Sequence, residues 1–120
     1  MDKVLLKAID LAKAMDKSIG KHRVCAIITN KKGRIISVAV NSYSKSSPFM
    51  YKYAKQVGLD DKIYWHAECK AIKQLIDMKQ AHKIYIARVT KSDNVGIAAP
   101  CPICAAAIKD AGIRSVEFTI

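Results

Sequence analysis

The chain has 120 residues, 51% of them hydrophobic, which is typical of one domain that buries a core, so we expect a single domain over residues 1–120. Lysine and arginine total 21 against 10 acidic residues, and the formal charge of +11 favours phosphate-bearing ligands as much as it fits a solvated basic surface. The first ten residues lack the apolar run of a signal peptide, and no later stretch approaches about 20 apolar residues. We therefore expect a cytoplasmic protein that has no membrane contact.

The first 40 residues predict a helix followed by a β-hairpin. Asp2 can cap a helix that ends near Gly20, because apolar side chains recur there at intervals of three and four residues. These side chains are Val4, Leu5, Ala8, Leu11, Ala12 and Met15. Residues 24–29 and 34–40 are short β-branched runs joined by the turn-forming residues 30–33. Their continuous apolar character predicts strands that are covered on both faces.

A long polar stretch then precedes a second set of elements. Residues 41–65 contain Pro48 and Gly58 and show no clean period, which predicts a loop with one short helix, and a loop of this length is usually functional. The expected elements after it are a helix from His66 to about Met78, a strand over 83–89, a helix from about Cys101 to Ala111 capped by Gly112, and a strand over 114–120. This order predicts an α/β fold, a mixed sheet with helices on both faces.

Four residues carry the chemistry that the sequence indicates. His66 and Glu68 lie at the start of one expected helix, and Cys101 and Cys104 lie at the start of another. At a helix N-terminus, unpaired N–H groups and the helix dipole lower the pKa of thiols, and zinc binds thiolates. One imidazole and two thiolates would hold Zn²⁺ with its fourth position open for water, and Glu68 would move the protons as a general acid and base.

The sequences His66-Ala67-Glu68 and Pro100-Cys101-Pro102-Ile103-Cys104 resemble the H-x-E and P-C-x-x-C signature of the cytidine/deoxycytidylate deaminase superfamily. The order of elements follows that family across nearly the whole chain. The resemblance implies a three-layer fold with about five strands, zinc as cofactor, and the family's tendency to form homo-oligomers. The P-C-P-x-C form is most similar to deoxycytidylate deaminases, whereas the short chain is similar to small phage- and virus-encoded relatives.

The same resemblance implies that Asn41 contacts the sugar of the substrate. Two further candidate substrate contacts are Ala67, between the histidine and the glutamate, and Trp65, directly before the histidine. Other aromatic side chains in or near the long loop are expected either to stack on bases or simply to pack; these are Phe49, Tyr51, Tyr53 and Tyr64. His22 and His82 have no partner at metal-like spacing and are interpreted as surface histidines.

Other interpretations of the cysteines stay open. Cys69 follows His66 by three residues and could complete a closed structural zinc site, although a structural site has no need of Glu68. A redox dithiol would use Cys101 and Cys104 and would leave the histidine and the glutamate unexplained. We expect Cys25 and Cys69 to be small buried apolar residues.

The favoured hypothesis is hydrolytic deamination of a free cytosine nucleoside or nucleotide, such as cytidine, deoxycytidine or dCMP, to its uracil form. The alternative within the enzyme class is a deaminase of cytosine or adenine in single-stranded DNA or RNA, motivated by the charge of +11 and the aromatic residues. An alternative of another class is a non-catalytic binding module that zinc stabilises.

Overall fold

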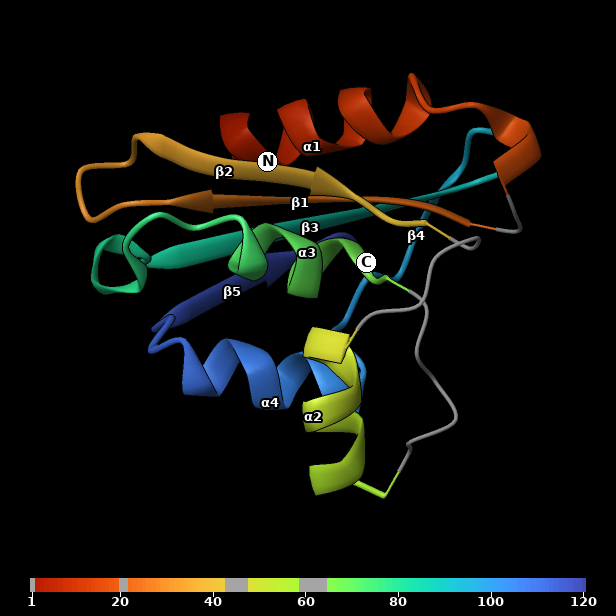
Figure 1. Ribbon diagram of the computed structural model, residues 1–120. Helices are drawn as coiled ribbons and strands as arrows, with labels where there is room; N and C mark the ends of the chain where they lie inside the picture. Colours follow the sequence, from red (N-terminus) through yellow and green to blue (C-terminus); the bar gives the residue numbers. More distant parts are fainter. Residues whose placement is uncertain (1, 20–21, 43–47, 59–64) are drawn as a thin grey trace.

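Five strands form one mixed sheet between layers of helices (Figure 1). The structure, a computed structural model, describes residues 2–19, 22–42, 48–58 and 65–120. Its helices are α1 (Lys3–Lys13), α2 (Pro48–Gln56), α3 (Ala67–Lys73) and α4 (Pro102–Asp110), with short 3-10 helices η1 (Lys17–Ile19) and η2 (Met78–Gln80). Its strands are β1 (His22–Thr29), β2 (Ile35–Val40), β3 (Lys83–Thr90), β4 (Val95–Gly96) and β5 (Ser115–Phe118).

The sheet has the strand order β2-β1-β3-β4, and β5 also pairs with β3. The pairs β2/β1, β1/β3 and β3/β4 are antiparallel, whereas β3 and β5 are parallel. β4 pairs with Arg88 and Val89, near the end of β3, while β5 pairs with its first half, Lys83–Ile86. α1 covers one face of the sheet, and α3, α4 and α2 lie on the other side (Figure 1). The predicted mixed α/β sheet with helices on both faces is confirmed.

The helix at the N-terminus begins as predicted and ends early. Asp2 caps it by accepting a hydrogen bond from the Val4 backbone N–H at 2.7 Å, and its buried side chains pack on β1 and β3. The helix ends at Lys13, so the predicted end near Gly20, a residue outside those described, is wrong. The physical reason is Arg23, whose guanidinium donates to the carbonyl oxygens of Lys13 (2.8 Å) and Met15 (3.3 Å) and so satisfies the end of the helix.

The hairpin of β1 and β2 lies where the sequence predicts it, but only one of its two strands is covered on both faces as expected. Asn30 Oδ1 accepts from the backbone N–H groups of Lys32 and Arg34, and Gly33 takes a φ of +84° in the turn. β1 is covered on both faces. β2 is an edge strand in which Val38 is 38% exposed, so the expectation of full coverage is wrong for β2.

α2, a helix of nine residues, is the one short helix predicted within residues 41–65. Two later elements differ from the sequence-based expectations. α3 ends at Lys73 rather than near Met78, because the chain turns and Asp77 caps η2, leaving Ile76 in solvent. β4 lies in a stretch for which no strand was expected, where it closes a hairpin whose turn contains Asp93 at a φ of +64°.

α4 ends just before its predicted C-terminal cap, Gly112. Gly112 has a φ of +75°, and its N–H donates to Lys109 O while Ile113 N–H donates to Ile108 O. This pair of bonds is a Schellman C-cap, for which glycine is the preferred residue. No helix among the described residues is both long enough and apolar enough to span a bilayer.

Candidate metal centre and pocket

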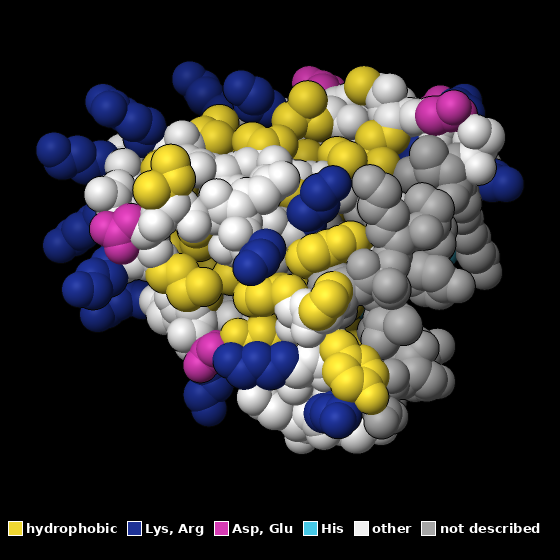
Figure 2. All heavy atoms as spheres, viewed as in Figure 1, with side chains coloured by type: hydrophobic (Ala, Val, Ile, Leu, Met, Phe, Trp, Pro, Cys, Tyr) yellow, Lys and Arg dark blue, Asp and Glu magenta, His cyan; other side chains and the backbone are white. Residues whose placement is uncertain are grey.

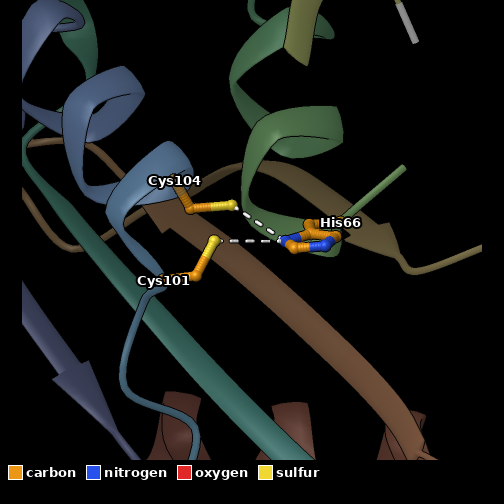
Figure 3. Close-up of side chains that lie close together, drawn as sticks. All are labelled: His66, Cys101 and Cys104. Atoms are coloured by element: carbon orange, nitrogen blue, oxygen red, sulfur yellow. Dashed lines mark hydrogen bonds between the residues drawn. The ribbon is translucent and has the colours of Figure 1, made fainter. Parts of the chain in front are cut away.

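The starts of two helices meet at one point, as the sequence predicts. His66 has an extended backbone directly before α3 and its side chain does not cap that helix. Cys101 has an extended backbone directly before α4, and Pro102 occupies the first turn, where its missing N–H costs no hydrogen bond. Cys104 lies one turn into α4, so both sulfurs face the His66 ring (Figure 3).

The distances between these side chains suit a tetrahedral metal ion. Nδ1 of His66 lies 3.5 Å from Cys101 Sγ and 3.3 Å from Cys104 Sγ, and the three donor atoms all lie within 4.8 Å of one another. Zinc bonds of about 2.3 Å to sulfur and about 2.0 Å to nitrogen at a tetrahedral angle require an N···S separation of about 3.5 Å. The three residues could therefore hold zinc after shifts of a few tenths of an ångström.

The two sulfurs of this group differ in acidity. Hydrogen bonding from Cys104, reinforced by the His66 ring, lowers the pKa of Cys101 to about 4, although burial opposes this shift. The bonded Cys101 sulfur, together with Cys69, raises the pKa of Cys104 well above its ordinary value. The pair thus favours one thiolate and one thiol, and removal of the second proton calls for a cation between them. Metal binding supplies that cation.

Cys69 falls outside the group of three. Its sulfur is buried and lies 3.4 Å from Cys104 Sγ, yet Cys69 does not join the group of donor atoms that lie within 4.8 Å of one another. Cys25 is also fully buried, on the opposite face of the sheet among the residues that pack against α1. All four cysteines are free thiols. The expectation that Cys25 and Cys69 are small buried residues agrees with this packing.

A pocket of about 250 Å³ opens beside the three residues. It is bounded by the ends of β1 and β2, the start of α3, the middle of β3 and the segment between β4 and α4. The lining side chains that bear on chemistry are His22, Asn41, Trp65, His66, Ala67, Glu68, Arg88 and Cys101. The volume lies just below the range of about 300–1,000 Å³ that holds drug-sized ligands, so it suits a small ring compound.

Glu68 is the acidic side chain among the described residues that line the pocket, and only 6% of it is exposed. Burial raises its pKa above the ordinary value, and the neighbouring His66 ring opposes this in part. A carboxyl group with a raised pKa beside a metal site can both accept and return a proton near neutral pH.

The three predicted substrate contacts all line the pocket, in different ways. Asn41 is already bonded to β1, since its Oδ1 accepts from Val24 N–H at 2.9 Å and its Nδ2 donates to His22 O at 3.2 Å. An amide has two donor hydrogens and an acceptor oxygen with two lone pairs, so further bonding capacity remains. Ala67 is a fully buried wall residue. Trp65 stacks on Phe49, with ring centroids 6.3 Å apart.

The other described aromatic residues of this region, Phe49, Tyr51 and Tyr53, are not among those that line the pocket. Phe49 and Tyr53 pack edge to face on α2, and the Tyr53 hydroxyl donates to Asp110 Oδ2 at 2.6 Å. Tyr51 is exposed, and the Lys55 ammonium lies over its ring. Tyr64 lies outside the described residues. Packing therefore explains Phe49 and Tyr53 better than base stacking does.

Two basic side chains of the pocket were not expected there from the sequence. His22, interpreted as a surface histidine, is half-buried at the start of β1 and lines the pocket. Arg88, on β3, contacts His22 Nε2 through its guanidinium and donates to Ile97 O at 3.1 Å. The signal that could have found Arg88 is a cation inside the apolar run of a central strand. His82 is half-buried at the other end of the sheet.

Comparison with known proteins agrees with this site and this fold. A family model described as the cytidine and deoxycytidylate deaminase zinc-binding region matches residues 1–120. Among solved structures, a mutant cytidine deaminase from Mycobacterium tuberculosis is similar, with a TM-score of 0.55 and 17% identity over 95% of this chain and 80% of that chain. At this identity the likeness shows the fold alone, and it confirms the expected deaminase-like architecture. No curated protein sequence matches the chain.

Proposed function

The chain belongs to the cytidine and deoxycytidylate deaminase family, and from this premise we propose that it deaminates a free cytosine nucleoside or nucleotide. Zinc is the cofactor of this family region. The reaction would replace the exocyclic amine of cytosine with the oxygen of water, giving the uracil compound and ammonia. The observation that carries the proposal is Glu68, a buried carboxyl group in a small pocket beside a histidine and two cysteines.

In this proposal His66, Cys101 and Cys104 are the zinc ligands. Zinc bound there supplies a Lewis acid that makes water a better nucleophile at neutral pH. Glu68 would accept one proton from the attacking water and deliver it to the ring nitrogen, then take the second proton from the hydroxyl group left on the ring carbon and deliver it to the amine, which departs as ammonia. The raised pKa of Glu68 supports both steps, because a carboxyl group with an ordinary pKa holds a proton too weakly to return it near pH 7.

The remaining pocket residues would bind and orient the ring. Trp65 offers an aromatic face that is held in place by Phe49, and Ala67 leaves room for a flat base against the start of α3. We propose that Asn41 uses its remaining hydrogen-bonding capacity for the sugar. The amide is fixed to the backbone of β1, so it would be ordered before the substrate arrives, which lowers the entropic cost of binding.

Glu68→Gln tests the mechanism, and Glu117→Gln is the matched control because Glu117 lies outside the pocket, where it forms a partly buried ion pair with Lys83. We expect Glu68→Gln to stay folded and to keep one zinc per chain, while ammonia release falls by at least about 100-fold, the lower bound for loss of a general acid–base group. The control should keep its activity. Normal turnover by Glu68→Gln would refute the mechanism, and a folded wild-type protein inactive on every substrate would favour the zinc-stabilised binding module.

The substrate panel is deoxycytidine, dCMP and a cytosine-containing oligonucleotide, each assayed by ammonia release. The charge of +11 favours a phosphorylated substrate, and it also motivates the alternative, a deaminase of cytosine or adenine in single-stranded nucleic acid. Activity on the oligonucleotide alone would reject the free nucleoside or nucleotide in favour of that alternative.

We also propose self-association near the pocket. Val95, Ile97 and Ile120 are 40%, 59% and 90% exposed, and the backbone bond from Ala98 N–H to Thr119 O brings these segments together. Exposed apolar side chains that gather on one surface favour burial against a partner. Light scattering would give the mass, and a monomer at micromolar concentration would refute the proposal. A single domain and a cytoplasmic location stay predictions.

A further inference from the structure

A second hollow lies at the other end of the sheet from the catalytic pocket. Its volume is about 860 Å³, and it shares no lining residue with the pocket. It is lined by the turn between β1 and β2, the segment around η2, and the end of α4 with the residues that follow. β1 spans the distance between the two sites, from His22 to Thr29, or about 23 Å at 3.3 Å per residue.

The side chains around this hollow are mostly cations. Its lysines and arginines are Lys31, Lys32, Arg34, Lys79 and Arg114. Asp110 is the acidic residue among the described lining residues, and its Oδ2 already accepts a hydrogen bond from Tyr53. Figure 2 shows dark blue side chains gathered at the end of the molecule where the β1–β2 turn and the end of α4 lie in Figure 1. We call this hollow the distal basic groove.

The groove has a fixed framework rather than a chance arrangement of mobile segments. The backbone N–H of His82 donates to Thr29 O at 2.9 Å, and Arg114 N–H donates to His82 O at 3.1 Å. Asn30 closes the turn that carries Lys31 and Lys32. The three segments that present the cations are thereby tied to one another at the ends of the strands.

No groove cation forms an ion pair with another described residue, Asp110 included. The ion pairs of the described residues join Lys17 and Arg23 to Asp93, and Lys83 to Glu117, and include none of the groove cations. Like charges brought together on a rigid framework repel one another, and an anion that spans them relieves this repulsion. Their spread over three segments suits several phosphates in a row better than a single one.

We propose that the distal basic groove binds the phosphodiester backbone of single-stranded nucleic acid without reading its sequence. No aromatic ring of Phe, Tyr or Trp is among the described lining residues, so the contacts available are to phosphates and not to base faces. A concave groove follows a flexible strand, whereas a duplex is usually read by elements that protrude into it. The inference does not depend on the substrate of the catalytic pocket.

The probe that tests this is fluorescent oligodeoxythymidylate of 12 nucleotides, which contains no cytosine for the catalytic pocket. The groove has 5 lysine and arginine side chains. If each neutralises one phosphate, the binding constant varies as about the −3.5 power of the salt concentration, which is a fall of about 100-fold from 0.1 to 0.4 M. With Lys32→Gln, Arg34→Gln and Arg114→Gln combined, two cations remain, and the fall over the same range shrinks to about 7-fold.

The matched control removes the same charge elsewhere, through Lys3→Gln, Lys7→Gln and Lys91→Gln at exposed positions outside the groove. Only the groove variant should lose the steep salt dependence, and both variants should stay folded by circular dichroism and retain activity on a free nucleoside. Equal losses in the two variants would mean that net charge alone attracts the strand and would overturn the proposal. So would wild-type binding as tight to deoxythymidine triphosphate, or to a duplex of equal length, as to the single strand.

Discussion

Arg23 is a buried cation that joins the end of α1 to the turn between β3 and β4, and only 1% of it is exposed. Its guanidinium donates to Lys13 O at 2.8 Å, to Met15 O at 3.3 Å and to Thr90 O at 2.7 Å, and it pairs with Asp93. Arg23→Met keeps an unbranched apolar side chain, although a shorter one, and removes every one of these bonds. It therefore tests how much this junction stabilises the fold.

The expected loss in the free energy of unfolding is about 3–5 kcal/mol. Hydrogen bonds from a charged donor contribute about 1.5–3 kcal/mol each. The loss of three of them outweighs the free energy gained when the apolar methionine side chain is buried. At about 2.1 cal/mol/K of unfolding entropy per residue, a chain of 120 residues should lose about 12–20 °C in Tm.

Thermal and urea unfolding of the zinc-loaded protein, followed by circular dichroism, measures this loss. Arg114→Met is the control, since Arg114 is exposed and its replacement should change stability by less than about 0.5 kcal/mol. Arg23→Lys should recover only part of the loss, because one ammonium cannot reach three carbonyl oxygens at once as the planar guanidinium does. A decrease below about 4 °C for Arg23→Met would refute the reasoning.

Three further predictions concern the metal centre, a helix end and a buried thiol. Cys104→Ala should weaken zinc binding by on the order of 100-fold or more, measured by competition with a chromophoric chelator, while Cys25→Ala should bind zinc as the wild type does. Gly112→Ala should lower the unfolding free energy by about 1 kcal/mol in urea titration, through backbone strain alone, because its φ is +75° and no atom lies within 4 Å of the added Cβ. Cys25 should resist alkylation at pH 8 until the protein unfolds, as mass spectrometry would show, because burial raises its pKa to about 11.

Local signals in the sequence were enough to predict the proposed zinc ligands and most of the sheet. Cys101 and Cys104 are one helical turn apart, so their proximity follows from the helix that Pro102 begins. His66 and Glu68 are two residues apart at the start of α3, so they too are close because of local sequence. The β-hairpin was predictable because its turn, Asn30 to Gly33, is stabilised by bonds between residues close in sequence.

The positions at which the helices end depend on tertiary contacts, which the local sequence pattern does not show. α1 ends at Lys13 because Arg23, from the next strand, satisfies the carbonyl groups there. α3 ends at Lys73, although apolar residues continue the helical spacing to Met78, because the chain turns into η2, which Asp77 caps, and Ile76 is left in solvent.

The sequence by itself pointed to the candidate donor set, because Cys101 and Cys104 lie within one helical turn and the resemblance to the family signature adds His66. Only the tertiary structure decided what surrounds that set. It brings His22 and Arg88 from two paired strands into the pocket, and it leaves Cys69 beside Cys104 but outside the group of metal-binding atoms. It also gathers the cations of three separate segments into the distal basic groove. Each of these outcomes depends on strand register and on the packing of distant segments, which the spacing of residues along the chain does not encode.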